Sequence, residues 1–193
     1  MSGLLLRAMD LNGLPVVTID GGEAVADVKD VVYSAERGTL LGFTLNKRGF
    51  LKGPMKAVLA FSDVAAIGRD AVMVETDAAV TQGGEALADV VEESSGRNVR
   101  GDDVLTDAGK RLGAVVDVVL DVANGEIVGY ELTGDKALQA HAGRPMLVPL
   151  PATRAVSGTT LIVPESVEPF VRDDLSGFGA AVDEFRHELP EES

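Results

Sequence analysis

Two aspartates inside apolar runs are the residues of this sequence whose type and position best suit acid–base chemistry. Asp30 lies within Val28–Val32, and Asp117 lies within Val115–Val119. A carboxylate held among apolar side chains is typical of general acids and bases. Catalysis also needs a nucleophile or an orienting group nearby, and no such partner recurs beside both aspartates. We therefore expect both to be structural carboxylates that accept hydrogen bonds beside a turn or bulge.

The other reactive residue types form no catalytic pattern. The sequence has no cysteine, and its two histidines, His141 and His187, are far apart, so a clustered ligand set for a transition metal is not evident. The glycine pairs Gly21-Gly22 and Gly83-Gly84 lack the spacing of a phosphate-binding loop and indicate turns. No candidate serine nucleophile has the Gly-x-Ser-x-Gly context, as inspection shows for Ser62, Ser94, Ser95, Ser157, Ser166 and Ser176.

We therefore expect a protein that is not an enzyme and that needs no cofactor. The purified protein should contain no stoichiometric transition metal and no flavin or nicotinamide, because it has neither thiols nor clustered imidazoles nor a phosphate loop. Elemental analysis and an absorbance spectrum test this prediction. A near-equimolar metal or a cofactor band would contradict it.

One loop concentrates positive charge in an otherwise acidic chain. The formal net charge is -14, yet the segment Lys47–Lys56 carries four cations and three apolar side chains among glycines and a proline. Such a loop could recognise a partner through charge and adaptable apolar contact. An ordinary solvated hairpin loop is the alternative interpretation. The possible partner-binding residues are Lys47, Arg48, Phe50, Leu51, Lys52 and Lys56.

Composition limits the kinds of partner. A strongly acidic surface repels phosphate backbones, and aromatic residues make up only 4% of the chain with no tryptophan, so we expect no direct nucleic-acid binding. No run approaches the roughly 20 apolar residues of a membrane helix, so we expect no transmembrane segment. The apolar start Met1–Arg7 is too short for a signal-peptide core. These features favour a cytoplasmic protein.

An internal repeat organises the chain. Aligning residues 17–45 with residues 104–132, at an offset of 87, gives 10 identities in 29 positions, where about 2 would be expected by chance. The match resumes at an offset of 89, where Val72–Val74 aligns with Leu161–Val163. Both copies are rich in valine and punctuated by glycine, which favours short strands joined by tight turns. Two copies of one small β unit explain this pattern.

The repeat predicts a mainly all-β chain of two tandem small β-barrels. Residues 1–80 form the first barrel, 81–97 a linker, 98–170 the second barrel, and 171–193 an acidic C-terminal helix and tail. In the linker, Glu85–Glu93 has a helical apolar stripe. The segment Asp173–Leu189 is a second amphipathic helix, which Asp173 or Asp174 can cap, and its apolar stripe should pack on a barrel or on another chain.

The order of these pieces resembles the PRC-barrel family. The resembling pattern is a glycine turn, then Val-x-Asp-Val-Val, a second glycine turn, an apolar strand and a closing Val-x-x-Ile-Gly-x-Asp-x-Val-x-Val. In the first copy it runs through Val28–Val32 and Val64–Val74, and in the second through Val115–Val119 and Thr153–Val163. The resemblance implies a small barrel that acts as a docking surface, with no shared catalytic site.

Two functions remain open from the sequence. The first is a non-catalytic adaptor or scaffold that docks a protein partner through a barrel face, the basic loop or the tail helix, with self-association possible. The second is a protein that binds a small ligand or cofactor in a barrel mouth or in the cleft between the two copies. The sequence names neither the partner nor the pathway.

Overall fold

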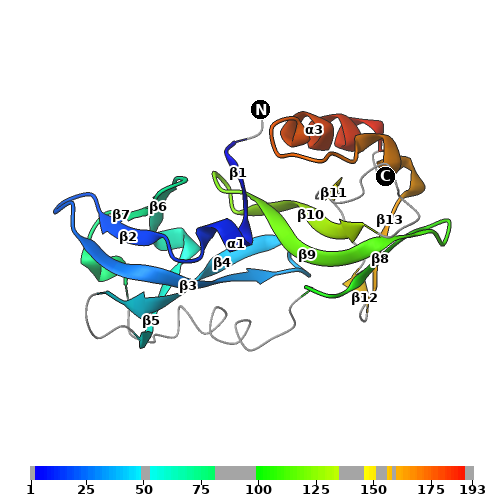
Figure 1. Cartoon of the computed structure of the whole chain (residues 1–193). Helices are drawn as coiled ribbons and strands as arrows, with labels where there is room; N and C mark the ends of the chain where they lie inside the picture. Colours follow the sequence, from blue (N-terminus) through cyan, green and yellow to red (C-terminus); the bar gives the residue numbers. More distant parts are fainter. Residues whose placement is uncertain are drawn as a thin grey trace. The chain divides into compact units, whose positions relative to one another are not determined.

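The protein is a mainly β chain, and the computed structural model describes residues 3–48, 53–80, 99–134, 146–150, 156–157 and 160–189 (Figure 1). It divides into two compact units. The first-copy unit comprises Leu6–Arg97 together with Val122–Glu126, and the second-copy unit comprises Met1–Leu5, Asn98–Asp121 and Ile127–Ser193. The helix expected at Glu85–Glu93 lies outside the described residues.

The first-copy unit is a curled sheet in the order β5-β4-β3-β2-β7-β6. Neighbouring strands are antiparallel, except that β2 and β7 are parallel to each other. Two short helical elements precede and follow this arrangement, α1 (Ala8–Leu11) and the 3-10 turn η2 (Asp77–Ala79). The strands are β2 (Pro15–Thr18), β3 (Ala24–Ser34), β4 (Thr39–Lys47), β5 (Gly53–Ala60), β6 (Val64–Ile67) and β7 (Val72–Val74).

The second-copy unit repeats this topology strand for strand. Its described order is β11-β10-β9-β8 with β13 and β12 beyond, and β8 and β13 are again the parallel pair. The shared topology confirms the expected fold of two similar β-rich copies. The strands are β8 (Asp103–Thr106), β9 (Arg111–Asp121), β10 (Glu126–Gly134), β11 (Met146–Pro149), β12 (Val156–Ser157) and β13 (Thr160–Val163).

The structure corrects the alignment of the first strands by one residue. Val16 pairs with Val72 on β7, and Val104 pairs with Leu161 on β13, so Val16 and not Val17 is the counterpart of Val104. The extra residue lies in the following turn. Thr18 N–H donates to the Glu23 carbonyl, whereas its counterpart in the second copy spans one residue fewer. The copies therefore differ by 88 positions before this turn and by 87 after it.

Two turns show how local residues shape the connections. The 3-10 turn η1 (Phe61–Asp63) is followed by the short strand β6 before the closing strand β7. At the hairpin Asn124-Gly125, only the glycine has positive φ, at 75°. The Asn124 side chain instead accepts a 2.9 Å hydrogen bond from the Glu126 N–H, which closes a longer turn.

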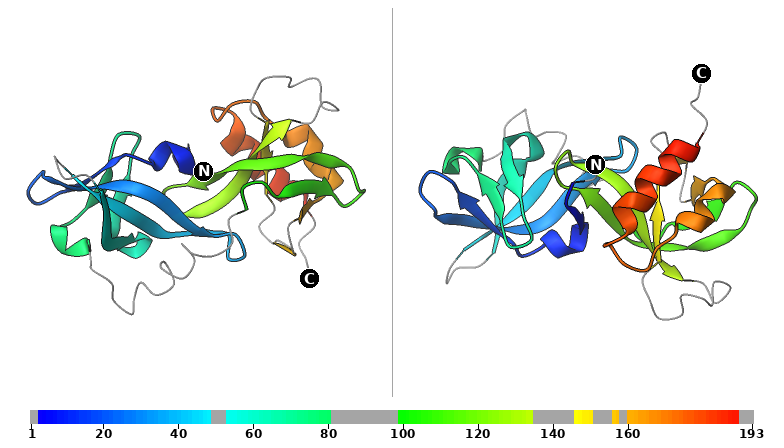
Figure 2. Two further views of the ribbon diagram at one scale, coloured as in Figure 1. Left: turned by 60° about the horizontal axis from the view of Figure 1, so that its bottom comes forward. Right: turned by 90° about the horizontal axis from the view of Figure 1, so that it is seen from above.

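The C-terminal helix α3 (Phe178–Glu188) packs within its own chain, on the second-copy unit (Figure 2). Its apolar stripe is buried against β11 and the 3-10 turn η5 (Glu165–Phe170). Gly129 on β10 leaves room for the Phe178 ring, since a Cβ there would overlap it. The core beneath the helix consists of Leu5, Val119, Val128, Leu147, Phe178 and Val182.

The prediction that Asp173 or Asp174 caps this helix is wrong. The residue before α3 is Gly177, and no side chain caps the helix. Asp174 instead accepts hydrogen bonds from the hydroxyl and the backbone N–H of Ser176, which lower the pKa of its carboxyl below its usual value. Because these bonds bind the side chain into its own turn, Asp174 is no longer available to the helix N–H groups.

Candidate functional site

The basic loop is shorter than the sequence indicates. Strand β4 ends at Lys47, β5 begins at Gly53, and these two residues are register partners at the base of the hairpin. Lys56, expected in the loop, lies within strand β5. The remaining candidates Phe50, Leu51 and Lys52 lie outside the described residues. The described part of the candidate site is therefore a sheet end and not a free loop.

An ion pair anchors this sheet end. The Arg48 guanidinium lies 3.1 Å from the Asp27 carboxylate on β3, with 40% of the Arg48 side chain and 27% of the Asp27 side chain exposed. A pair this open to water contributes little to stability, because solvent screens it. It does fix where the guanidinium points. Lys47 and Lys56 are exposed on the surface of the same hairpin.

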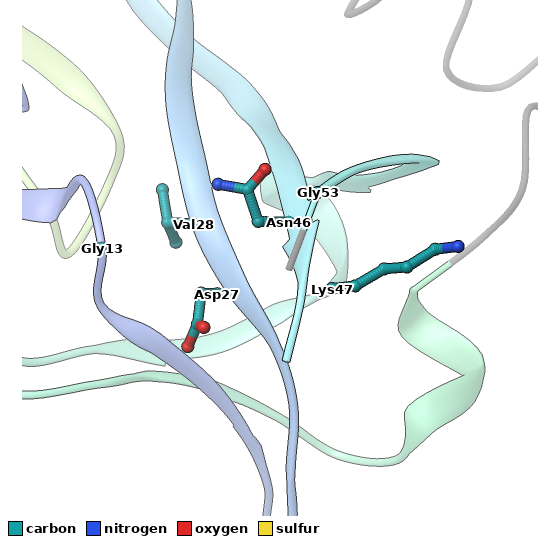
Figure 3. A pocket seen from close by; sticks show the side chains of 6 residues that line it. All are labelled: Gly13, Asp27, Val28, Asn46, Lys47 and Gly53. Atoms are coloured by element: carbon teal, nitrogen blue, oxygen red, sulfur yellow. The ribbon is translucent and has the colours of Figure 1, made fainter. Parts of the chain in front are cut away.

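A polar pocket of about 430 Å³ opens at the base of the hairpin (Figure 3). The Asn46 amide points toward Val28, which supplies the apolar side chain among the lining residues, while the Lys47 side chain extends away from them (Figure 3). Carboxylate, amide and backbone groups dominate the wall, so the pocket suits hydrogen-bonding groups better than an apolar ligand. Its lining is Gly13, Asp27, Val28, Asn46, Lys47 and Gly53.

Among the residues that the structure describes, the aligned positions of the second copy carry different side chains. Ala114 and Thr133 stand where the first copy has Asp27 and Asn46. The Thr133 hydroxyl is engaged with the backbone of Ala114, at 3.3 Å from both its N–H and its carbonyl oxygen. The sequence analysis found the hairpin cations but missed Asp27 and Asn46. The available signal was the difference between the two copies at these aligned positions, where Asp27 faces Ala114 and Asn46 faces Thr133 in the alignment.

The two aspartates of the apolar strands have different surroundings. Asp117 is buried, with 1% of its side chain exposed, and it pairs at 3.0 Å with Arg100 from the turn before β8. Asp30 is 61% exposed and lies 3.5 Å from the Lys29 ammonium. The expected structural role thus fits Asp117, and the Arg100 guanidinium is one of its partners. The same expectation is wrong for Asp30, which faces solvent.

The remaining reactive residues are scattered. His187 is exposed at the end of α3, with its Nδ1 2.7 Å from the Asp183 carbonyl oxygen. His141, Ser94 and Ser95 lie outside the described residues. Within the part of the chain that the structure describes, no three His, Cys, Asp or Glu side chains cluster as a metal site would require. Over the same residues, no helix is long and apolar enough to cross a membrane.

Comparison with known families recovers the duplication. The model of the PRC-barrel domain matches the chain twice, over residues 5–80 and residues 91–167. Together these matches cover well over half of the chain, and each contains one copy of the six-stranded topology. No curated protein sequence matches the chain significantly. The chain belongs to the PRC-barrel domain family, as a tandem pair of such domains.

Proposed function

We propose that this tandem PRC-barrel protein is a non-catalytic adaptor that docks a protein partner at the hairpin of its first-copy unit. The observation that supports the proposal is a difference between two otherwise matching copies. Both keep the same strand order, but the first presents the Asp27–Arg48 pair, the Asn46 amide and exposed lysines, where the second has Ala114 and Thr133. A duplicated fold whose copies diverge in surface groups suits a scaffold with one specialised docking site.

The environment of the acidic residues also supports a role without catalysis. Asp117 is buried, and its carboxylate is engaged at 3.0 Å by the Arg100 guanidinium. Asp27 is paired with Arg48 on an open surface. Each carboxylate is thus engaged with a guanidinium of its own unit, which is the arrangement of a structural ion pair.

A small-ligand role is the second candidate, and the pocket at the hairpin is the observation that favours it. Its volume of about 430 Å³ would admit a small polar molecule. Its open, polar wall offers little apolar area for burial, so we place it behind protein docking. Thermal-shift screening with polar metabolites separates the two roles, since a ligand that binds only the native state raises the melting temperature.

Affinity purification from the native host, with the full chain as bait, tests the adaptor function. We expect a protein partner to be retained in near-stoichiometric amount and to be released as salt concentration rises, because surface charges guide the contact. Retention of no partner under low-salt conditions, together with a thermal shift by a small molecule, would contradict the adaptor function in favour of ligand binding.

Charge reversal at the hairpin tests the docking site. The triple variant Lys47→Glu, Arg48→Glu and Lys52→Glu should bind the captured partner at least about tenfold more weakly and with a shallower salt dependence, because it removes the cations that steer an acidic surface. The measurement is affinity at several salt concentrations by calorimetry or interferometry.

The matched control changes net charge equally at exposed cations away from the hairpin. Its substitutions are Arg37→Glu, Lys110→Glu and Arg111→Glu. This variant should keep most of the affinity. If both triple variants lose the same affinity, net charge and not the hairpin governs binding, and the docking site lies elsewhere.

A further inference from the structure

We propose that the protein forms a weak symmetric dimer in which the outer face of β2, β7 and β6 packs against the same face of a second copy. This inference does not require the adaptor function, although the face shares the cations Lys47 and Arg48 with the docking hairpin. It rests on an apolar row across three adjacent strands and on the opposite charges at the two ends of that row. The strands lie side by side in the first-copy unit (Figures 1 and 2).

The apolar row follows from strand alternation. Val16 and Val72 are fully buried inward, so the intervening positions of the two strands point outward. Val17 and Met73 are register partners there, and Met73 is in turn paired with the exposed Ala66 on β6. Ile19 continues the row beyond β2 and is 52% exposed. Val17 and Met73 are half-buried, whereas Ile19 and Ala66 are exposed, and a continuous apolar strip of this kind can serve as an interaction surface.

The end of the face where β2 and β7 finish is acidic. The two strands are parallel and β6 is antiparallel to β7, so the residues after β2 and β7 lie at the same end as those before β6. A 3.2 Å hydrogen bond from the Asp20 N–H to the Glu75 carbonyl ties two of these segments together. The exposed charged residues that the structure describes at this end are Asp20, Glu23, Asp63 and Glu75.

The opposite end carries the cations. Arg69 is exposed in the turn between β6 and β7. The hairpin cations Lys47 and Arg48 lie at the same end, because Asp27, the ion-pair partner of Arg48, is the register partner of Pro15 at the start of β2. This end also carries Asp27 and the exposed Asp70, so its charges are nearly balanced, whereas the exposed charged residues named at the other end are all acidic.

The charges select one arrangement of the two copies. When two identical faces stack, the two-fold axis lies in the interface plane, either along the strands or across them. An axis along the strands would place acidic end on acidic end. An axis across the strands places the acidic end of each copy over the basic end of the other, with Val17 and Met73 at the centre. An apolar centre with a charged rim is the usual anatomy of a protein interface.

The corresponding face of the second copy differs at its centre and supplies an internal control. Leu105 and Ile162 are register partners, and Ile162 is 47% exposed. The β9 neighbour of Leu105 is Arg111, which is ion-paired with Asp103 at 2.6 Å. In the first copy the neighbour of Val17 is Ala24. A charged pair beside the apolar residues makes the second face costlier to desolvate.

The size of the face sets the expected affinity. The three strands lie about 4.8 Å apart and each presents a few residues, which gives a patch on the order of 15 Å on a side. Interfaces that bury less than about 1,200 Å² in total are typically weak and transient, and a patch of this size falls below that value. We therefore expect a dissociation constant of roughly 10–100 µM at low salt.

Sedimentation velocity on the full chain, from about 5 µM to about 500 µM, tests the proposal. The unmodified protein should shift from monomer to dimer over this range, and Met73→Glu should weaken association at least tenfold, because it brings two like charges together at the two-fold axis. Ile162→Glu, with the same charge change at the equivalent outward position, should leave the dimer intact.

Arg69→Glu keeps the test decisive if Met73→Glu fails to fold. Arg69 is exposed in a turn, and its reversal should weaken the dimer at low salt but have little effect near 0.5 M salt, where surface charges are screened. A chain that remains monomeric throughout overturns the proposal. So does a dimer that neither first-copy variant weakens, or one that Ile162→Glu weakens equally.

Discussion

Replacing Phe178 with alanine should lower the free energy of unfolding of the second-copy unit by about 3–5 kcal/mol. The ring is fully buried in the core between α3 and the sheet, where it meets Leu5, Val119 and Leu147. Truncation removes its transfer free energy and leaves a cavity that Gly129, with no side chain, cannot fill. Urea unfolding followed by circular dichroism measures the loss.

The matched control is Glu184→Ala on the exposed side of the same helix. It should change the free energy of unfolding by no more than about 0.5 kcal/mol, as is usual for surface substitutions. Two units can unfold in two transitions, so the transition that Phe178→Ala shifts should be assigned to the second-copy unit by proteolysis of each state. Equal, small effects of both variants would indicate that α3 contributes little to this unit.

This result would also bear on function. The sequence left the tail helix open as a docking element, because an apolar stripe can bind in cis or in trans. The structure shows the stripe occupied in cis, with Phe178, Val182 and Phe185 all buried. A helix whose apolar face is already covered offers a partner only its polar side. Docking is therefore better sought on the sheet surface and the hairpin of the first-copy unit.

Much of the fold could be predicted from local signals. Val-rich runs between glycine turns indicate short strands, and the duplication predicts that the two copies share a topology. Strand β6 is hard to recognise in the sequence, because Val64–Ile67 is short, lacks clear alternation and follows a turn signal. The inclusion of Met1–Leu5 in the second-copy unit could not be predicted, because the burial of Leu5 beside Phe178 depends on contacts between distant segments that no periodicity records.

The candidate site was only partly accessible from the sequence. Clustered cations in Lys47–Lys56 are visible as composition, but Asp27 and Asn46 resemble ordinary surface residues of a strand. Their proximity follows from the antiparallel register of β3 and β4, in which these two residues are direct partners. Register depends on the turns and bulges between strands. A single extra residue in the Thr18–Glu23 turn was enough to displace part of the alignment.

The same limit explains why Asp30 and Asp117 appear equivalent in sequence and differ in structure. The local sequence around both is apolar, but the residue that neutralises Asp117 comes from a different segment, 17 positions earlier. At the 88-residue offset that applies there, the counterpart of Arg100 is Asn12, which carries no charge. Asp30 therefore has no cation from that segment, and its carboxylate stays in water, 61% exposed beside the exposed Lys29 ammonium.

Asp117→Ala should therefore lower the free energy of unfolding by about 3 kcal/mol, while Asp30→Ala should change it by no more than about 0.5 kcal/mol. Breaking a buried pair by removing one partner typically costs 3–5 kcal/mol. The lower end applies because Arg100 keeps 34% of its side chain exposed, so that water can solvate the guanidinium that remains.

Arg100→Ala should cost at least as much as Asp117→Ala, because it leaves a carboxylate in an almost fully buried position. The double variant should lose less than the sum of the two single losses, and this difference is the coupling energy of the pair. Urea unfolding of the four proteins gives the cycle. A catalytic carboxylate would show the opposite pattern, since active-site charges are commonly held at a cost to stability and their removal raises it. Stabilisation by Asp117→Ala would thus contradict the structural role and reopen the question of acid–base chemistry at this aspartate.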